Sequence, residues 1–306
     1  MRPLYLLLFC ALFLPSCMTL RPFEEIRRQV PQDRFVPVDG HLVHVEQAGQ
    51  GEPLVLLHGF GASTYGWREV MPRLARSHRV IAVDLYGFGY TERPRDRKYY
   101  TREGQASLIL GVLDALGIQK AHFMGSSYGG ALTLWMASRH PERVCSMVLV
   151  DSAAPTYPDD RRSLAALPPF GGLFLRLVAL RPGMVRKALQ AAYYDDSLVT
   201  PELVQAYYDR VRVEGVKNAY YGLTAPVPGP RPRIDLEAID IPALVVWGEE
   251  DQLISVDLGR RVSSRLPRSE FVVMEKTGHL PMEERPEEFL RIVEPFLAQE
   301  RPCGSR

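Results

Sequence analysis

Six short segments of this chain are apolar at almost every position, and this pattern restricts the possible folds more than any other feature of the sequence. A strand with one face in water alternates apolar and polar residues, whereas a strand that is apolar throughout is covered on both faces. The sequence therefore predicts a parallel sheet with helices on both sides. The segments are 54–57, 80–83, 122–124, 147–150, 243–247 and 271–274.

Helical patterns lie between these segments. One apolar face with helical spacing consists of Ile109, Val112, Leu113 and Leu116. Gly117 follows it as a stop signal, and residues 129–139 form a second helical pattern. Alternating strands and helices predict the fold class α/β, with an open, mostly parallel, doubly wound sheet. A chain of 306 residues that is 46% hydrophobic can bury one large core.

The core is predicted to occupy residues 34–153 and 234–298, with a tail at 299–306. It begins with a hairpin, because Asp39-Gly40 separates two short β-prone runs. Most of the strands that follow end directly before a glycine or a polar residue. In a doubly wound sheet, ligands bind beyond the carboxyl ends of the strands, so the functional site is expected there.

A G-x-S-x-G motif at residues 125–129 has Ser127 at its centre. It follows a predicted strand and precedes a predicted helix, the context in which this motif presents a nucleophile on a sharp turn. The turn also places the positive end of the helix beside the charge that develops during attack. Ser127 is therefore the predicted nucleophile, and Ser126 occupies the variable position before it.

A serine nucleophile needs a base to take its proton and an acid to orient that base. His279 follows the last apolar segment and is the predicted base, whereas the other histidines, His58 included, are predicted to be structural or surface residues. Asp251, just past the fifth apolar segment, is the predicted acid. Asp151, just past the fourth segment, is the alternative, and two glutamates directly precede Asp251. The order serine, aspartate, histidine is the one described for this motif.

The anion formed during attack needs two backbone N–H groups. We predict that they belong to Tyr128, directly after the nucleophile, and to Phe60 in the glycine-containing loop 58–62. A second glycine-rich turn at 84–89 lacks the lysine and the spacing of a phosphate-binding loop, and it is predicted to be scaffold.

Residues 154–233 contain no convincing strand and predict a helical cap inserted over the site. Thr200 as an N-cap followed by Pro201 is its best helix start. Large apolar side chains in this region indicate an apolar pocket, although they could equally pack the cap onto the core. These residues are Phe170, Leu173, Phe174, Tyr193 and Tyr194.

The N-terminus is separate from this domain. An apolar run at 4–14 is shorter than the roughly 20 residues of a membrane span, and it predicts a signal peptide over 1–16. Residues 14–17 (LPSC) resemble the lipobox of bacterial lipoproteins. The resemblance implies lipid on Cys17 and export, with the enzyme anchored to a bacterial membrane and facing the periplasm or the cell exterior. Residues 17–33 are predicted to be a tether, although the charged stretch from about 20 to 32 could also be a short helix. Ordinary signal cleavage and an uncleaved anchor are the alternatives.

The formal net charge is only +1, so the composition does not indicate nucleic acid or another polyanion as a partner. The four cysteines, Cys10, Cys17, Cys145 and Cys303, show no paired spacing. We therefore predict neither a disulfide nor a zinc site, and we expect Cys145 to pack as a small buried hydrophobic residue.

The motifs at 58–61, 84–89, 125–130, 247–251 and 278–279 together resemble the α/β-hydrolase superfamily, and the resemblance covers nearly all of the core and cap. It is strongest to capped esterases, cofactor-free haloperoxidases and carbon–carbon bond hydrolases. Members with an aspartate nucleophile are disfavoured by the serine at 127. The resemblance implies neither a metal nor an organic cofactor. One departure is Thr91, where members often carry serine.

These observations predict a serine hydrolase that acts on a small, apolar ester or related carbonyl compound through an acyl-enzyme. The first alternative is hydrolysis of a carbon–carbon bond in a diketone-like compound, which the fold and the triad do not distinguish from ester hydrolysis. The second is a non-catalytic binding lipoprotein on the same fold. The presence of Ser127, Asp251 and His279 together argues against the second alternative.

Overall fold

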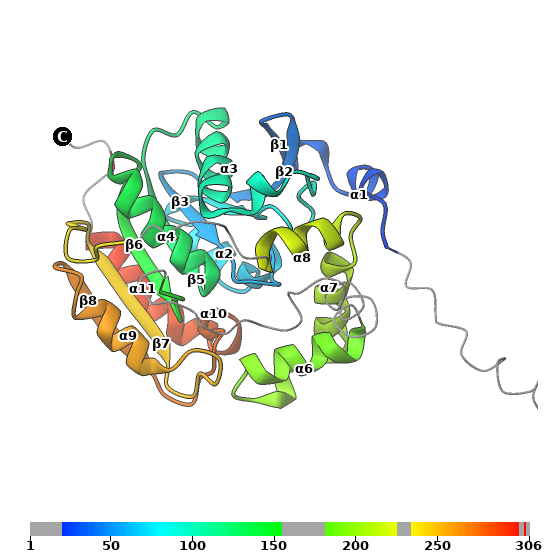
Figure 1. Cartoon of the computed structure of the whole chain (residues 1–306). Coiled ribbons are helices and arrows are strands. Elements are labelled where there is room, and N and C mark those ends of the chain that lie inside the picture. Colours follow the sequence, from blue (N-terminus) through cyan, green and yellow to red (C-terminus); the bar gives the residue numbers. More distant parts are fainter. Residues whose placement is uncertain (1–19, 155–180, 225–233, 300–302, 304–306) are drawn as a thin grey trace, which may run out of the picture.

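The computed structural model describes residues 20–154, 181–224, 234–299 and 303. At its centre is an eight-stranded sheet with the order β1-β2-β4-β3-β5-β6-β7-β8 (Figure 1). The strands are β1 (Phe35–Val38), β2 (His41–Ala48), β3 (Glu52–Leu57), β4 (His78–Val83), β5 (Ala121–Ser126), β6 (Val144–Val150), β7 (Ala243–Gly248) and β8 (Ser269–Met274). β2 is antiparallel to both of its neighbours, and the six strands from β4 to β8 along the sheet are parallel. The predicted doubly wound α/β fold is confirmed.

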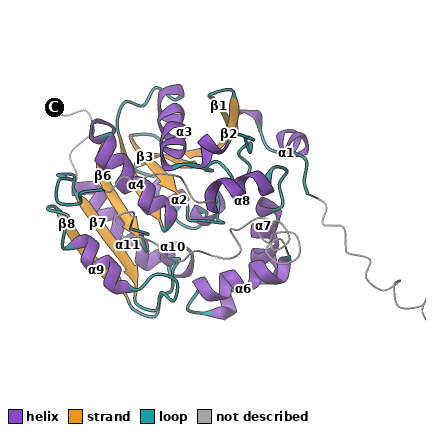
Figure 2. Cartoon of the chain, viewed as in Figure 1, coloured by secondary structure: helices purple, strands orange, loops and turns teal. Residues whose placement is uncertain are grey.

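All six apolar segments lie within strands, and their side chains alternate between two hydrophobic clusters. In β3, Val55 and Leu57 pack into the cluster formed with α3, α4 and α9, whereas Leu54 and Leu56 pack into the cluster formed with α2 and α11. Each of these four side chains is at most 1% exposed. Burial on both faces explains why the strands lack alternating polar residues, and Figure 2 shows the strands enclosed by helices. The α-helices are α1 (Phe23–Gln29), α2 (Met71–Leu74), α3 (Arg102–Ala115), α4 (Tyr128–Arg139), α6 (Pro182–Ala192), α7 (Pro201–Val211), α8 (Val216–Thr224), α9 (Val256–Ser263), α10 (Pro281–Glu284) and α11 (Pro286–Gln299).

The predicted hairpin joins β1 to β2. Asp39 and Gly40 have φ angles of 47° and 76°. Positive φ at both central residues is what a two-residue turn of the favoured type requires, and the Asp-Gly pair supplies it at low steric cost.

The described part of the predicted cap, residues 181–224, is called the cap segment below. It consists mainly of α6, α7 and α8, which stand beside the sheet in Figure 1. Thr200 caps α7 as predicted, because its side chain accepts a hydrogen bond from the Leu203 N–H at 3.2 Å and Pro201 opens the helix. Three of the predicted aromatic or apolar cap residues, Phe170, Leu173 and Phe174, lie outside the described residues.

Of the two interpretations of residues 20–32, a tether or a short helix, the structure shows the short helix α1. Helix α1 packs onto the body of the protein through Ile26, which is fully buried in a cluster with Phe35 and Val213. Arg21 also pairs by backbone hydrogen bonds with the chain at 212–214. A few apolar residues in a charged segment are enough to dock it. Within the described residues, none of the helices has the length and apolar character needed to cross a membrane.

The prediction that the cysteines are unpaired is also wrong. Cys145, at the start of β6, forms a disulfide with Cys303 in the tail, and their Cα atoms are 5.5 Å apart. Cys145 is half-buried at the amino end of the inner strand β6, not packed as a buried hydrophobic residue. The Cys303 N–H also donates a hydrogen bond to the Glu52 carboxylate at the start of β3. The two cysteines lie 158 positions apart, and the sequence near either one carries no local signal of this pairing.

Candidate active site

Ser127 lies on the turn between β5 and α4, with φ 52° and ψ −114°. A positive φ is unfavourable for a residue with a Cβ atom, so the surrounding structure must hold it. Two backbone hydrogen bonds do so, from the Ser127 N–H to the Val150 carbonyl (2.9 Å) and from the Ala153 N–H to the Ser127 carbonyl (3.0 Å). The serine therefore stands at the carboxyl edge of the sheet, where the motif places it.

The two outer glycines of the motif are required by close backbone contacts. A Cβ atom on Gly125 would lie 2.4 Å from the Gly129 carbonyl oxygen, and one on Gly129 would lie 2.1 Å from the Leu57 carbonyl oxygen. Neither clash can be relieved without moving the main chain, so α4 can approach β3 and β5 this closely only with glycine at both positions.

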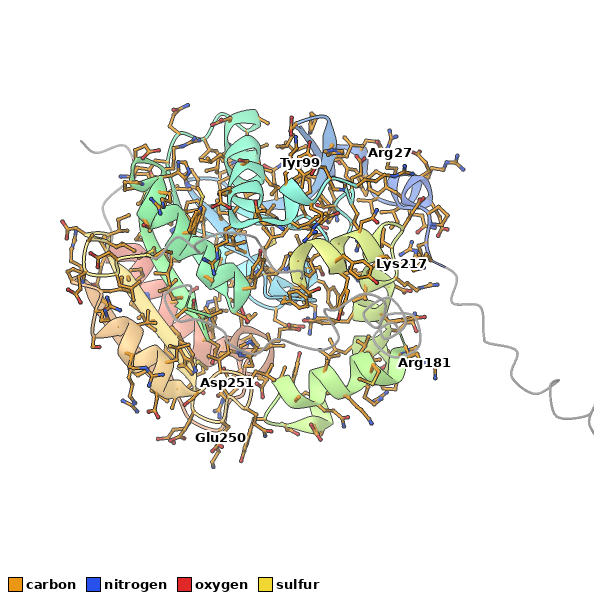
Figure 3. All side chains as sticks on the ribbon, in the orientation of Figure 1. Arg27, Tyr99, Arg181, Lys217, Glu250 and Asp251 are labelled. Atoms are coloured by element: carbon orange, nitrogen blue, oxygen red, sulfur yellow. A yellow bond between two sulfur atoms is a disulfide. The ribbon has the colours of Figure 1, made fainter. Side chains whose placement is uncertain are left out.

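His279 and Asp251 lie together, as the sequence predicts. Nδ1 of His279 is 2.7 Å from Oδ2 of Asp251. The other carboxylate oxygen of Asp251 accepts hydrogen bonds from the N–H groups of Leu253 (2.8 Å) and Ile254 (3.0 Å), which fix its orientation. The Asp251 side chain is fully buried and that of His279 is 7% exposed. In Figure 3, Asp251 lies on the loop after β7, on the side where α6 is found.

The other acidic residues that the sequence offered as partners do not hydrogen-bond to His279. Asp151 is fully buried, but its Oδ1 accepts a hydrogen bond from the Gly248 N–H (2.9 Å) and it makes no hydrogen bond to His279. Glu249 and Glu250 are exposed. Of the seven histidines, all of which are described, only His279 lines the cavity next to Ser127. The geometry thus favours Asp251 as the partner of His279.

The loop 58–62 passes directly beside Ser127. A Cβ atom on Gly59 would lie 3.1 Å from the Ser127 Cβ, and Phe60, a residue that is 55% exposed, lines a cavity together with Ser127. Tyr128 is the first residue of α4. These positions allow the Phe60 and Tyr128 N–H groups to approach a carbonyl oxygen bound at Ser127, and their role stays a prediction.

His58 holds this loop in place. The Leu85 N–H donates to its Nε2 (3.1 Å), so the ring proton is on Nδ1, which donates to the Gly59 carbonyl (2.7 Å). Burial lowers the pKa of His58, which keeps the ring neutral. The residue therefore ties the loop 58–62 to the turn 84–89 and has the structural role expected for it.

Asp84 at the end of β4 is the centre of a second buried network. Its carboxylate accepts hydrogen bonds from the Thr64 and Tyr90 N–H groups and lies 2.8 Å from Nδ1 of His44. Burial alone would lower the pKa of His44, but the charge of Asp84, assisted by Glu46, raises it to about 9. The pair is charged at neutral pH and anchors the turn 84–89, which agrees with the predicted scaffold role.

A cavity of about 470 Å³ connects the nucleophile with the cap segment. Ser127 and His279 both line it, together with loops of the core and residues of all three cap helices. The cap contribution is largely apolar: Met184, Val185, Ala188, Leu189, Val216, Ala219 and Leu223. Tyr193 and Tyr194, which the sequence offered as pocket residues, are not among the lining residues. They instead belong to the attachment of the cap segment to the core.

The attachment centres on two glutamates of α10 that sequence reasoning missed. The buried carboxylate of Glu283 pairs with Arg68 and accepts hydrogen bonds from the hydroxyl groups of Tyr193 (3.0 Å) and Tyr207. Glu284 accepts hydrogen bonds from the N–H groups of Tyr194 (2.7 Å) and Gly278 (2.8 Å). Burial raises the pKa of both carboxyl groups.

His279 itself is part of this junction. Its N–H donates to the Ala192 carbonyl at the end of α6, at 2.6 Å. The catalytic candidate His279 and the two glutamates lie within six residues, so one short stretch both presents the base and fastens the cap segment. The only sequence signal for this is the pair of acidic residues after Leu280-Pro281.

Two groups of side chains among the described residues bring three metal-type donor atoms within 4.8 Å of one another. In the first group, His122, Cys145 and Cys303, the two sulfur atoms are bonded to each other and are not thiolates. The second group is Asp151, Asp251 and His279. Its 2.7 Å nitrogen–oxygen contact is shorter than the roughly 3.3 Å between ligands about 2.0 Å from a tetrahedral zinc ion. This geometry is that of a hydrogen bond.

A buried histidine oriented by a carboxylate, in a cavity that is also lined by a serine on a strained turn, suits nucleophilic attack on a carbonyl group. The histidine can take the serine proton and return it to the leaving group. The cap side of the cavity is lined largely by apolar side chains. Cys17, the predicted lipidation site, lies outside the described residues.

Comparison with known proteins gives a consistent picture. The family model for the alpha/beta hydrolase fold matches residues 52–286. A 2-hydroxymuconate semialdehyde hydrolase from Pseudomonas sp. (strain CF600) is 34% identical over 278 residues, which cover 87% of this chain and 94% of that protein.

Solved structures are similar over most of the chain. A meta-cleavage product hydrolase from Pseudomonas fluorescens IP01 has 29% identity and a TM-score of 0.73, and the match covers 87% of this chain and 97% of that one. A membrane phospholipase A described as a bacterial virulence factor has 28% identity and a TM-score of 0.68, with 90% of each chain covered.

Proposed function

The chain belongs to the alpha/beta hydrolase fold family, and from this premise we propose that it is a serine-type hydrolase that cleaves a carbon–carbon bond beside a carbonyl group. The observation that carries the hydrolase assignment is the contact of Asp251 with His279 at 2.7 Å in a cavity that Ser127 also lines. The choice of bond is supported by the relatives, which are named as hydrolases of 2-hydroxymuconate semialdehyde and of meta-cleavage products.

In the proposed reaction, Ser127 Oγ attacks a ketone carbonyl as His279 takes its proton. The N–H groups of Phe60 and Tyr128 stabilise the resulting oxyanion. When this intermediate collapses, the carbon–carbon bond breaks and the leaving carbon takes the proton from His279. Water then hydrolyses the acyl-enzyme with His279 again acting as base. The leaving carbon must be stabilised by a second, conjugated carbonyl, so a diketone-like compound is the proposed substrate class.

Ester hydrolysis is the second candidate, and the cavity favours it independently. Its cap side is lined largely by aliphatic side chains, and Phe60 and Leu253 expose more than half of their side chains among its lining residues. Such a surface suits an acyl chain. The membrane phospholipase A among the structural neighbours shows that a similar fold can serve a lipid ester.

One comparison of rates separates the candidates. Purified protein would be assayed against a conjugated 2-hydroxy-6-oxo-dienoic acid and against p-nitrophenyl esters of graded chain length, with Ser127→Ala as the control in each assay. We expect the higher kcat/KM on the diketone-like acid. A higher kcat/KM on the esters would replace the first candidate with the second. Labelling of Ser127 by a fluorophosphonate tests the remaining alternative, because a non-catalytic binding lipoprotein would not react.

We also propose that the enzyme is exported and lipid-anchored through Cys17. The apolar run at 4–14 and the LPSC sequence at 14–17 support this. The disulfide between Cys145 and Cys303 supports export as well, because disulfides persist in oxidising compartments. Mass spectrometry of the mature N-terminus tests the proposal: we expect a lipid-modified Cys17. An unmodified N-terminus at another residue would overturn the anchor and leave the hydrolase assignment intact.

A further inference from the structure

Two carboxyl groups, not one, lie behind the base. Asp151 directly follows β6 and Asp251 follows β7, and these strands are parallel neighbours. One carboxylate oxygen of each aspartate and a ring nitrogen of His279 lie within 4.8 Å of one another. The side chain of Asp251 is fully buried, and so is Asp151 as a whole.

The hydrogen bonds of the two aspartates are unequal. Asp251 receives three, from Leu253 N, Ile254 N and His279 Nδ1. Asp151 receives one, from Gly248 N on Oδ1. Its buried Oδ2 has no donor among the residues that the structure describes. A carboxylate oxygen of Asp251 lies within 4.8 Å of one of the Asp151 carboxylate oxygens. Two carboxylates cannot hydrogen-bond to each other, so a hydrogen bond between these side chains requires a proton on one of them.

The proton belongs on Asp151. Three donors stabilise the charge of Asp251, whereas burial raises the pKa of Asp151 well above its usual range and the negative charge of Asp251 raises it further. Glu284 on α10 is the other carboxyl group that acts on Asp151 in this direction. Burial and a like charge both disfavour ionisation.

The backbone around Asp151 links the turn that carries Ser127 to strand β7, which precedes Asp251. Its φ of 43° is unusual for a residue other than glycine, and its N–H is fixed to the Val246 carbonyl (3.0 Å). Its neighbours Val150 and Ala153 are hydrogen-bonded to the backbone of Ser127. The residue therefore lies between the turn that carries the nucleophile and the loop that carries Asp251.

We propose that Asp151 is a positioning residue of the triad: as a neutral carboxylic acid it donates a hydrogen bond to Asp251, and it becomes the ionised partner of the base when the charge at position 251 is removed. The inference rests on the proposed serine-hydrolase function. During attack the proton of Ser127 moves to His279, and the charge of Asp251 stabilises the imidazolium. A second negative charge beside Asp251 is avoided as long as Asp151 holds its proton.

The test measures the rate at which a fluorophosphonate labels Ser127, since this requires the activated serine but no knowledge of the substrate. Four proteins are compared from pH 5 to pH 10: wild type, Asp151→Asn, Asp251→Asn and the double variant. Asn at 151 has the size of Asp and can donate the same hydrogen bond, so this variant should fold and label within about threefold of wild type. Thermal unfolding confirms folding in each case.

Asp251→Asn should lower the labelling rate by about 10³- to 10⁴-fold, with a residual rate that rises with pH as Asp151 ionises. The double variant should lose at least a further tenfold and the rise with pH. If the second substitution has the same small effect in both backgrounds, the inference is overturned. If wild type itself is not labelled, the proposed function fails, and the two failures are thereby distinguished.

Discussion

Removal of the Glu283 carboxylate should weaken the attachment of the cap segment to the core and lower the stability of the protein. Glu283 is fully buried and pairs with Arg68, whose side chain is 25% exposed, while the hydroxyls of Tyr193 and Tyr207 donate to it. Breaking a buried ion pair from one side costs about 3–5 kcal/mol. For a chain of this size, Glu283→Ala should lower the Tm by roughly 5–8 °C.

The matched control is Glu287→Ala on α11. Glu287 also pairs with an arginine, Arg73, at 2.9 Å, but its side chain is 77% exposed. Exposed ion pairs contribute little, so the Tm should change by less than about 2 °C. Differential scanning calorimetry measures both variants, and limited proteolysis should show earlier cleavage within residues 181–224 of Glu283→Ala only. Equal Tm shifts in the two variants would refute the argument that Glu283 fastens the cap.

The same residue predicts a pH dependence. Burial raises the pKa of Glu283 above its ordinary value of 4.5 in the folded protein, despite the opposing charge of Arg68. A raised folded pKa means that the contribution of the group to stability is complete below pH 4.5 and falls as the pH rises through the folded pKa. Wild type should therefore lose stability relative to Glu283→Gln over this range, as measured by urea unfolding. A constant difference between the two proteins would contradict this.

Three further outcomes are expected. Ser127→Ala should reduce activity by several orders of magnitude. Ser126→Ala removes a buried hydroxyl with no partner among the described residues, and its activity should stay within about threefold of wild type. The reverse result would mean that the motif is misassigned. The pKa of His44 is raised to about 9 beside Asp84, so wild type should lose about 3 kcal/mol of stability between pH 6.5 and 9, and His44→Asn should lack this slope in urea titrations. Cys303→Ser should lower the stability by about 2–4 kcal/mol and abolish any response of the Tm to dithiothreitol, and an unchanged Tm would show that the disulfide does not form.

The sheet and the position of the site could be predicted because both depend on local patterns. Each buried parallel strand is a short apolar run, and each chemical group follows the end of one: Ser127 after β5, Asp251 after β7 and His279 after β8. Parallel strands bring their carboxyl ends to one edge, so the order of residues along the chain is enough to bring these groups together. The choice between Asp251 and Asp151 required the structure, since both follow neighbouring strands and differ only in which one reaches His279.

Contacts between distant segments could not be predicted, because nothing in the sequence near one partner identifies the other. The disulfide joins residues 158 positions apart, and Arg68 lies 215 positions from Glu283. Isolated charged residues usually face water, so a buried glutamate in a helix of four residues has no distinguishing pattern. The docking of α1 was missed for a related reason, since Ile26 stands alone among charged neighbours.

The core and the cap segment contribute different parts of the site, and a backbone hydrogen bond joins them at His279. The proposed nucleophile, acid and base are held by the core, whereas the apolar lining on the cap side of the cavity belongs largely to α6 and α8. The backbone bond from His279 to Ala192 joins the base directly to the end of α6. In the proposed reaction, a substrate that fills the cavity and packs against α6 would therefore also hold His279 in position. Binding energy from the apolar part of the substrate, remote from the reacting carbonyl, would then increase kcat. Truncated substrates should for that reason lose kcat as well as affinity, whichever bond is broken.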